Sequence, residues 1–295
     1  MCGTGLQSDP SSSPSMARTL PIDRRDLAGP FDIVGDVHGC IDELDELLER
    51  LHGTGPARVV VYVGDLVDRG PDTPAVLRRV MSDVAAGRAL SVIGNHDDKL
   101  LRKLRGRNVQ IKHGLERSLE QLARESQAFR QRVADFLDSL ASHLVLDGRR
   151  LVVAHAGLED WMIGRDDRRI REFALYGATT GRIDEHGMPE RLDWTRRHRD
   201  SAYLAYGHTP VEKPEWRGRT VDIDTGCVFG GNLTALRYPE MEFVSVPARA
   251  AYAERGRPFL RWGPGGPPFE AAAGAEAEPG AGPPADRVIR SPGEH

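Results

Sequence analysis

Five short polar clusters along the chain bring together residue types that bind metal ions and act on phosphate esters. They are Gly35-Asp36-Val37-His38-Gly39, GDLVDRG at 64–70, GNHD at 94–97, AHAG at 154–157 and GHT at 207–209. Their candidate ligands mix oxygen and imidazole donors: Asp36, Asp65, Asn95, His38, His155 and His208. Such a mixture suits borderline divalent metals, and the set is too large for one tetrahedral ion. Two metal ions about 3.5–4 Å apart that share a carboxylate are the usual arrangement for hydrolysing phosphate esters.

Each cluster alone is a weak signal, because a Gly-Asp or Gly-His pair in a turn is usually structural. The five clusters together are stronger evidence for a functional site, because each directly follows a short apolar run rich in β-branched residues. These runs are FDIV, RVVVYV, ALSVI, RLVVAH and AYLAY. In open α/β sheets, ligands bind beyond the carboxyl ends of the strands. The clusters are therefore expected to meet at one edge of the fold, although Asp36 and His208 lie far apart in the chain.

The sequence between the clusters alternates between strand and helix patterns. Apolar residues fall on one helical face at 41–51, and valines recur every four residues at 74–86. Helices that alternate with strands imply parallel pairing through crossover connections. TVDIDTGCV at 220–228 predicts a sixth strand, and LTALRYPEMEFVSV at 233–246 predicts a hairpin that turns at Pro239-Glu240. The hairpin indicates that the sheet there becomes mixed or antiparallel.

Residues 97–146 interrupt this alternation and are predicted to be a wholly helical insertion. The predicted apolar stripe consists of Leu115, Leu119, Leu122, Phe129, Val133, Phe136, Leu137 and Leu140. Residues 99–132 hold ten Lys and Arg against three Glu, although the whole chain has a net charge of −4. A solvated helix face accounts for most charge runs of this kind. Beside an active site, the same charge would favour an anionic substrate.

Both ends of the chain have the composition of disordered segments. Residues 1–29 are rich in Ser and Pro, and residues 263–295 are rich in Pro, Gly, Ala and Glu, so the folded domain is expected at 30–262. Met16 is an alternative start to Met1. The N-terminus lacks the apolar core of a signal peptide, and no apolar run of about 18 residues predicts a membrane span. Three cysteines without a CxxC pair favour a reducing, cytoplasmic location over a disulfide framework or a thiolate zinc site.

GDVHG, GDLVDRG and GNHD resemble the motifs of the calcineurin-like metallophosphoesterases of the phosphoprotein-phosphatase type. The resemblance covers residues 31–246. It implies an α/β sandwich of two mixed β-sheets flanked by helices, with a helical cap insertion at 97–146 and a dinuclear metal site at one end. The two divalent metal ions would be Mn²⁺ by preference, with Ni²⁺, Fe and Zn²⁺ as alternatives.

The same resemblance implies a role for each residue of the clusters. The ligands would be Asp36 and His38 for the first metal, Asp65 as the bridge, and Asn95, His155 and His208 for the second metal. His96 would protonate the leaving oxygen and would be oriented by Asp68. Arg69 would hold the phosphoryl oxygens with its guanidinium fork. A metal-bound water, whose pKa falls from about 15.7 toward 7, would attack the phosphorus.

The C-terminal part resembles two bacterial branches of that family. The matching stretches are FALYGATTGRIDEHGMPERLDW at 173–194 and YGHTPVEKPEWRGRTVDIDTGCVFGGNLTALRYPEMEFVSV at 206–246. One branch contains asymmetric bis(5′-nucleosyl)-tetraphosphatases, and the other is the phosphatase module of RNA-repair polynucleotide kinase-phosphatases. Both branches have the aspartate of IDTG near the metals, here Asp224, for which a turn cap before Gly226 is the alternative. Cys227 is interpreted as a small core residue.

Three functions remain open on the sequence. The absence of a GxxxxGK[ST] loop and of a ligase-sized segment favours a stand-alone hydrolase of phosphorylated nucleotides. That enzyme would cleave diadenosine tetraphosphate asymmetrically into ATP and AMP. The alternative is a phosphomonoesterase acting on phosphoprotein Ser/Thr or on RNA 2′,3′-phosphate ends. A non-catalytic metal-dependent scaffold is disfavoured because His96, Arg69 and all the ligands are present.

Overall fold

Two mixed β-sheets form the centre of the structure, a computed structural model that describes residues 21–52 and 57–260. The five-stranded sheet has the order β13 (Glu242–Pro247), β12 (Asn232–Tyr238), β2 (Phe31–Val34), β3 (Val59–Tyr62) and β4 (Ala89–Ser91). The six-stranded sheet has the order β1 (Asp23–Arg24), β5 (His143–Leu146), β6 (Leu151–Ala154), β9 (Tyr203–Tyr206), β11 (Thr220–Asp222) and β10 (Trp216–Arg217). Strands β2, β3 and β4 are parallel, as are β6, β9 and β11, and the other pairings make both sheets mixed.

The two sheets enclose a shared apolar layer. Ile33 of β2 and Val61 of β3 pack in one cluster with Val153 of β6, Ala205 of β9 and Val221 of β11. Helices cover the outer side of each sheet, so the central strands are buried on both faces. Strands of this kind appear in a sequence as continuous apolar runs. This explains why FDIV, RVVVYV and RLVVAH could be recognised as strands.

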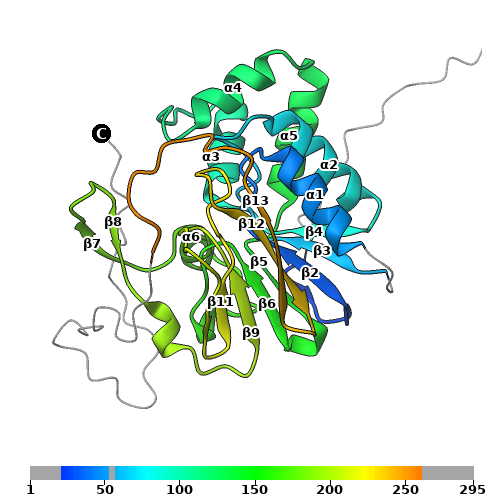
Figure 1. The fold of residues 1–295 in the computed structure, drawn as a ribbon, viewed down its shortest axis with the longest axis vertical. Coiled ribbons are helices and arrows are strands. Elements are labelled where there is room, and N and C mark those ends of the chain that lie inside the picture. The colour runs from blue at the N-terminus through cyan, green and yellow to red at the C-terminus, as the bar shows by residue number, and fades with distance from the viewer. Residues whose placement is uncertain (1–20, 53–56, 261–295) are drawn as a thin grey trace, which may run out of the picture.

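The outer layers are helical (Figure 1). The five-stranded sheet is covered by α1 (Ile41–Leu51), α2 (Thr73–Ala85), α3 (Asn95–Leu104), α4 (Leu115–Ala123) and α5 (Gln127–Ser139). The six-stranded sheet is covered by α6 (Arg168–Tyr176) and the 3₁₀ turns Asp160–Met162 and Trp194–Arg197. A third 3₁₀ turn, Asp147–Arg149, follows β5. A small hairpin of β7 (Thr179–Ile183) and β8 (Pro189–Arg191) follows α6.

This architecture confirms the predicted fold class, with mixed sheets flanked by helices. The helices expected at 41–51 and 74–86 are α1 and α2. The predicted hairpin is the antiparallel pair β12 and β13, with its turn at residues 239–241. Asp72 caps α2 by accepting a hydrogen bond from the Ala75 N–H at 2.9 Å, and Pro74 lies in the first turn, where it is tolerated.

The expectation that residues 97–146 are wholly helical is wrong in two places. Residues 105–114 form a loop between α3 and α4, where Gly106 and Gly114 adopt positive φ angles of 78° and 95°. Residues 143–146 form β5, which pairs with β6 at the centre of the second sheet. The run HLVL is buried on both sides, and a short apolar run does not by itself distinguish a strand from a buried helix.

The N-terminal boundary also differs from the prediction. Residues 21–29, expected to belong to a disordered leader, contain β1, which pairs in parallel with β5, and Ile22 and Leu27 pack against the layer between the sheets. The rest of the predicted leader and the predicted tail at 263–295 lie outside the described residues. Within residues 21–52 and 57–260, no helix is both long and apolar enough to cross a membrane.

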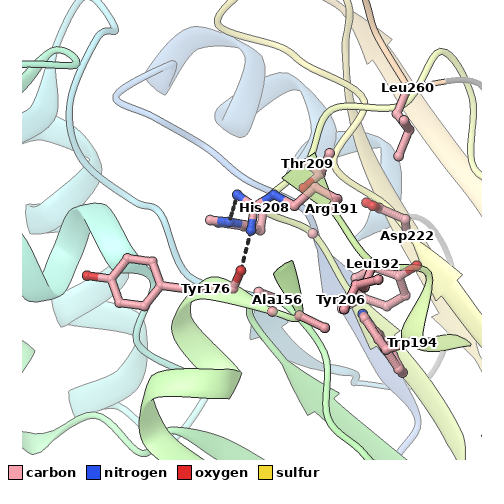
Figure 2. A pocket seen from close by; sticks show the side chains of 13 residues that line it. Ala156, Tyr176, Arg191, Leu192, Trp194, Tyr206, His208, Thr209, Asp222 and Leu260 are labelled. Carbon is pink, nitrogen blue, oxygen red and sulfur yellow. Dashed lines mark hydrogen bonds between the residues drawn. The ribbon is translucent and has the colours of Figure 1, made fainter. Parts of the chain in front are cut away.

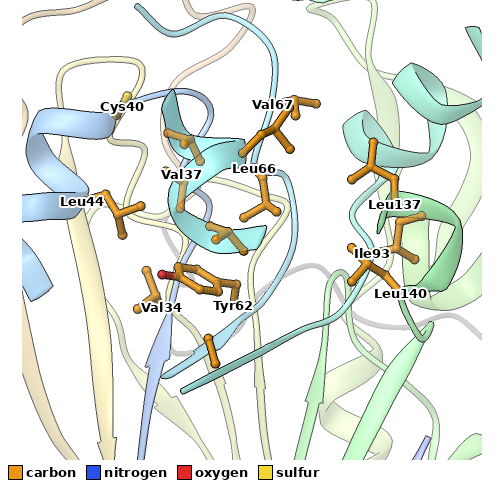
Figure 3. Packing of buried hydrophobic residues seen from close by; sticks show 14 of the residues in the cluster. Val34, Val37, Cys40, Leu44, Tyr62, Leu66, Val67, Ile93, Leu137 and Leu140 are labelled. Carbon is orange, nitrogen blue, oxygen red and sulfur yellow. The ribbon is translucent and has the colours of Figure 1, made fainter. Parts of the chain in front are cut away.

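The layer between α1 and the five-stranded sheet gives a stability prediction. Leu44 of α1 is fully buried beside Val34 and Tyr62 (Figure 3). We expect Leu44→Ala to lower the free energy of unfolding by about 2–5 kcal/mol, because it removes buried methyl groups and leaves a cavity. Ile183→Ala, at a side chain that is 54% exposed, is the control and should change it by less than about 0.5 kcal/mol. Urea denaturation measures both, and equal effects would contradict the assignment of Leu44 to the core.

Candidate metal centre and catalytic residues

Every polar cluster identified in the sequence lies at the carboxyl end of a strand. The clusters of Asp36, Asp65, Asn95, His155 and His208 follow β2, β3, β4, β6 and β9 in that order. Both sheets therefore contribute to one site. The backbone N–H of His208 donates to Asp36 Oδ2 at 3.2 Å, which joins the first and last clusters across 172 positions.

Asp65 occupies the centre of this site. Its Oδ2 lies 3.6 Å from His38 Nε2 on one side and 3.4 Å from His155 Nε2 on the other. His155 Nε2 is also 2.9 Å from Asn95 Oδ1. We call these four atoms, Asp65 Oδ2, His38 Nε2, His155 Nε2 and Asn95 Oδ1, the acceptor cluster. The carboxylate has the position of a bridge between two groups of ligands.

The protonation of the two imidazoles makes the acceptor cluster electron-rich. Nδ1 of His155 lies 3.1 Å from the Val63 carbonyl, and Nδ1 of His38 lies 2.7 Å from the Val67 carbonyl. A carbonyl only accepts, so these contacts assign the ring protons to Nδ1 and leave a lone pair on each Nε2. Lone pairs that face a carboxylate and an amide oxygen repel one another unless a proton donor or a cation lies between them, and Arg69 and His208 offer such donors at the edges of the cluster. The donor set therefore fits divalent metal ions, with carbonyl partners that orient the imidazoles as expected for metal ligands.

Two further predicted ligands lie beside the acceptor cluster. His208 Nδ1 is 3.0 Å from His155 Nε2 and 2.8 Å from Asn95 Oδ1. Asp36 is buried, and a Cβ placed on Gly207 would lie 2.0 Å from its Oδ1, so only glycine leaves room for this carboxylate. Within this site, potential ligand atoms come within 4.8 Å of one another in two groups of described residues, which are His38, Asp65 and His96, and Asp65, His155 and His208. Asp36 belongs to neither group.

Burial changes the protonation equilibria of this site. Desolvation raises the pKa of Asp65 and of Asp36 well above the usual range, and neighbouring carboxylates add to the effect. Desolvation also lowers the pKa of His155 to about 3 and lowers that of His208 strongly. A bound cation would accept the lone pairs of the neutral imidazoles and would offset the charge of carboxylates that have little positive charge nearby.

His96 and Asp68 form a buried pair next to the acceptor cluster. His96 Nδ1 lies 2.7 Å from Asp68 Oδ2, which leaves Nε2 as the atom able to reach a substrate. The rings of His96 and His38 are in edge-to-face contact at 4.9 Å. Burial raises the pKa of Asp68 to about 6, and the backbone N–H of Asp68 is held by Ser118 Oγ at 2.9 Å. The predicted pairing of these two residues is present in the structure.

Arg69 directs its guanidinium group into the same space. Its Nη1 donates to His38 Nε2 at 2.7 Å, and its Cζ lies 5.3 Å from the ring centre of Phe229. Burial lowers the pKa of Arg69, while the charges of Asp65 and Asp68 oppose that change. The side chain is thus a buried cation beside the acceptor cluster.

Asp224 satisfies both interpretations drawn from the sequence. Its Oδ1 accepts a hydrogen bond from the Gly226 N–H at 3.0 Å, as a turn cap would. Its charge also raises the pKa of Asp36, so the two buried carboxylates are neighbours. Its own pKa is raised by burial to about 6.

The sequence did not identify Asp97 as a structural link within the site. Its Oδ1 accepts from Leu66 N and its Oδ2 from Gly94 N, both at 3.0 Å, so it ties the loop after β3 to the start of α3. Burial raises its pKa to about 7. Its position inside the GNHD motif was the one sequence feature that could have indicated this linking role.

The sequence also missed Arg191, at the end of β8. Arg191 Nη2 lies 2.6 Å from His208 Nε2, and Nη1 donates to the Tyr176 carbonyl (Figure 2). Burial lowers its pKa to about 10. Arg191 and Asp222 line a small pocket next to His208, and Arg191 Nε and Asp222 Oδ2 have no hydrogen-bond partner within the described part of the chain. A charged residue in a polar hairpin gives no local sign of such a role.

Known proteins resemble this chain over most of its length. Residues 29–212 match the family described as Calcineurin-like phosphoesterase. Proteins named bis(5′-nucleosyl)-tetraphosphatase PrpE [asymmetrical], from Anoxybacillus flavithermus and Bacillus subtilis, are 44% and 41% identical, covering 78% of this chain and 99% of each relative. A crystal structure assigned as a diadenosine tetraphosphatase is 27% identical, with a TM-score of 0.57, covering 78% of this chain and 97% of that one.

A more distant similarity concerns the fold alone. A protein serine/threonine phosphatase structure from Saccharomyces cerevisiae has a TM-score of 0.56 at 15% identity, covering 80% of this chain and 85% of that one. The family and sequence matches, together with the acceptor cluster and the strand-end motifs, identify the protein family. The chain belongs to the calcineurin-like phosphoesterase family of metal-dependent hydrolases.

Proposed function

We propose that this protein hydrolyses dinucleoside polyphosphates asymmetrically, producing ATP and AMP from diadenosine tetraphosphate. The observation that carries the chemistry is the acceptor cluster, in which buried lone pairs from both sheets converge on Asp65. The substrate is inferred from relatives with 39–45% identity whose names specify asymmetrical tetraphosphatase activity. They match 78% of this chain and 99% of each relative.

We assign the two metal ions to the residues around Asp65. Asp36 and His38 would hold the first ion, Asp65 would contribute to both, and Asn95, His155 and His208 would hold the second. When bound, two divalent cations supply Lewis-acid activation of water and neutralise charge on the phosphoryl group. We propose Mn²⁺ as the native ion, with Ni²⁺, Fe and Zn²⁺ as alternatives. Asp224 is an additional candidate because it lies beside Asp36.

The remaining residues bind and orient the phosphoryl group. Arg69 and Arg191 approach the metal centre from two sides, and their guanidinium groups suit hydrogen bonding to phosphoryl oxygens. Water adds to phosphorus, the bond from phosphorus to the leaving oxygen breaks, and His96 supplies a proton to that oxygen when it is basic. Asp68 fixes the His96 ring through Nδ1. A polyphosphate leaving group depends less on this proton, because it leaves as a stable anion.

The products of diadenosine tetraphosphate test the proposed function directly. We expect the protein with Mn²⁺ to release ATP and AMP in equal amounts, measured by ion-exchange chromatography, because cleavage next to one end of the chain separates one phosphate from three. Removing metal with EDTA should abolish turnover, and Asp65→Asn should reduce it by a factor of about 10³ or more because the bridging charge is lost. Formation of two ADP molecules would contradict asymmetric cleavage, and unchanged activity of Asp65→Asn would contradict the metal assignment.

The proposed acid role of His96 predicts dependence on the leaving group. His96→Ala should slow hydrolysis of an alkyl phosphate by about 10²–10⁴-fold, the usual contribution of a general acid. Hydrolysis of an activated aryl phosphate should fall much less, because a phenolate leaves without a proton. Steady-state kcat on both substrates measures the difference, with His52→Ala at the exposed end of α1 as the control. Equal losses on both substrates would reject the acid role.

The close approach of Gly207 to Asp36 predicts an effect on metal affinity. A methyl group at residue 207 would lie 2.0 Å from Asp36 Oδ1, so Gly207→Ala must displace the carboxylate or the loop. We expect Mn²⁺ affinity, measured by calorimetry, to fall about 10–100-fold, as for other changes that misplace a ligand. Gly256→Ala is the matched control, because a Cβ there has its nearest neighbour at 4.0 Å. Unchanged affinity in Gly207→Ala would argue against Asp36 as a ligand.

A further inference from the structure

The metal centre has a distinct border on the side of His96. This border, which we call the cationic border, consists of Lys99 on α3 and Lys112 and His113 in the loop 105–114. Lys99 Nζ donates to the Lys112 carbonyl at 2.7 Å, so the helix and the loop are tied together. Both lysines and His113 are absent from the roles assigned above.

The loop that carries the cationic border is packed directly on Arg69. The Arg69 N–H donates to the Gly114 carbonyl at 3.4 Å. A Cβ on Gly114 would lie 2.5 Å from Arg69 Cγ, so no side chain separates the two segments. The position of the loop is therefore linked to the position of an arginine that faces the metal site.

The charges of the cationic border act on the catalytic pair. Lys99 follows His96 by three residues in α3, so the two side chains lie on the same face of the helix. Lys99 also opposes the rise that burial causes in the pKa of Asp68, the partner of His96. The border thus lies on the side of the pair that would meet the leaving oxygen.

The positive charge of the border is largely uncompensated. Arg105, the first residue of the same loop, is paired with Asp135 and Asp138 across the cap. Within the described chain, by contrast, no carboxylate forms an ion pair with Lys99 or Lys112. Glu116 is the nearby acid, and its Oε1 accepts from the Gly114 N–H at 3.3 Å. Lys99 and Lys112 therefore border the His96 side with one exposed carboxylate, Glu116, beside them, while burial and the two lysines lower the pKa of His113, which adds a neutral imidazole.

We propose that Lys99, Lys112 and His113 form a subsite for the leaving polyphosphate. This inference rests on the proposed function and deepens it by explaining why cleavage is asymmetric. A leaving triphosphate carries more negative charge than a leaving diphosphate and reaches further from the attacked phosphorus. Cations placed beyond His96 stabilise the longer leaving group and so select the phosphorus next to the short end of the chain.

A charge-removal variant of the cationic border tests this subsite. We expect Lys99→Gln combined with Lys112→Gln to lower kcat/KM for diadenosine tetraphosphate about 10–100-fold more than kcat/KM for p-nitrophenyl phosphate, because charge-assisted contacts to the distant phosphates are lost. The inhibition constant of inorganic tripolyphosphate against p-nitrophenyl phosphate should rise at least about 10-fold, while that of orthophosphate should change much less. Lys99→Arg combined with Lys112→Arg keeps both charges and should restore most of each effect.

A control variant and the contrary outcomes decide whether the subsite exists. Arg88→Gln removes one positive charge at the opposite end of β4 and should alter neither substrate. Equal losses on both substrates, or no change in tripolyphosphate inhibition, would overturn the subsite. If the native protein formed no ATP and AMP but its tripolyphosphate inhibition still required the lysines, the proposed function would fail and the subsite would stand. Thermal unfolding of each variant separates these results from misfolding.

Discussion

The structure depends on a buried cluster of electron pairs around Asp65 that needs nearby positive charge to be stable. Asp65 Oδ2 faces two imidazole nitrogens at 3.4 and 3.6 Å, and both rings have their protons committed to backbone carbonyls. Buried like-sign charge and facing lone pairs are unfavourable without compensation. The loops that hold these groups must therefore be fixed by other interactions. Asp97 provides one of them, since its carboxylate joins the loops after β3 and β4.

Backbone conformation shows that the protein maintains this arrangement against local preference. Nine non-glycine residues of the described chain have positive φ angles, and five of them lie in the site: His38 (46°), Asp65 (49°), Asp68 (74°), Arg69 (69°) and His208 (77°). Such conformations cost about 1–3 kcal/mol each and persist where the surroundings impose them. Here the His38 N–H donates to the Asp65 carbonyl at 2.8 Å, which joins two of the strained turns. The strained turns bring side chains that follow separate strands into one cluster.

The sequence was sufficient to predict the structural features that single short segments encode. The ligand clusters could be recognised because each follows a buried strand directly, and the carboxyl ends of parallel strands meet at one edge. Arg191 could not be recognised, because it reaches His208 from a half-buried strand of a hairpin whose sequence contains no motif for a ligand-binding residue. Strand β5 was missed because its four residues follow three helices and bury both faces, so they lack the alternation that marks a half-exposed strand. Local sequence patterns do not reveal contacts between segments that are distant in the chain.

The basic segment 99–132 shows why composition alone is a poor guide to an anionic site. Much of its excess positive charge is engaged within the fold. Arg105 pairs with two aspartates, Arg130 donates to the carbonyls of Leu122 and Glu125, and Arg117 donates to the Tyr252 carbonyl. Charges engaged in this way hold the cap together and contribute little to substrate attraction. Lys99 differs, because its Nζ is held by the Lys112 carbonyl and it has no ion-pair partner among the described residues. It is that combination, rather than the number of basic residues, that gives a charged segment the geometry of a binding site.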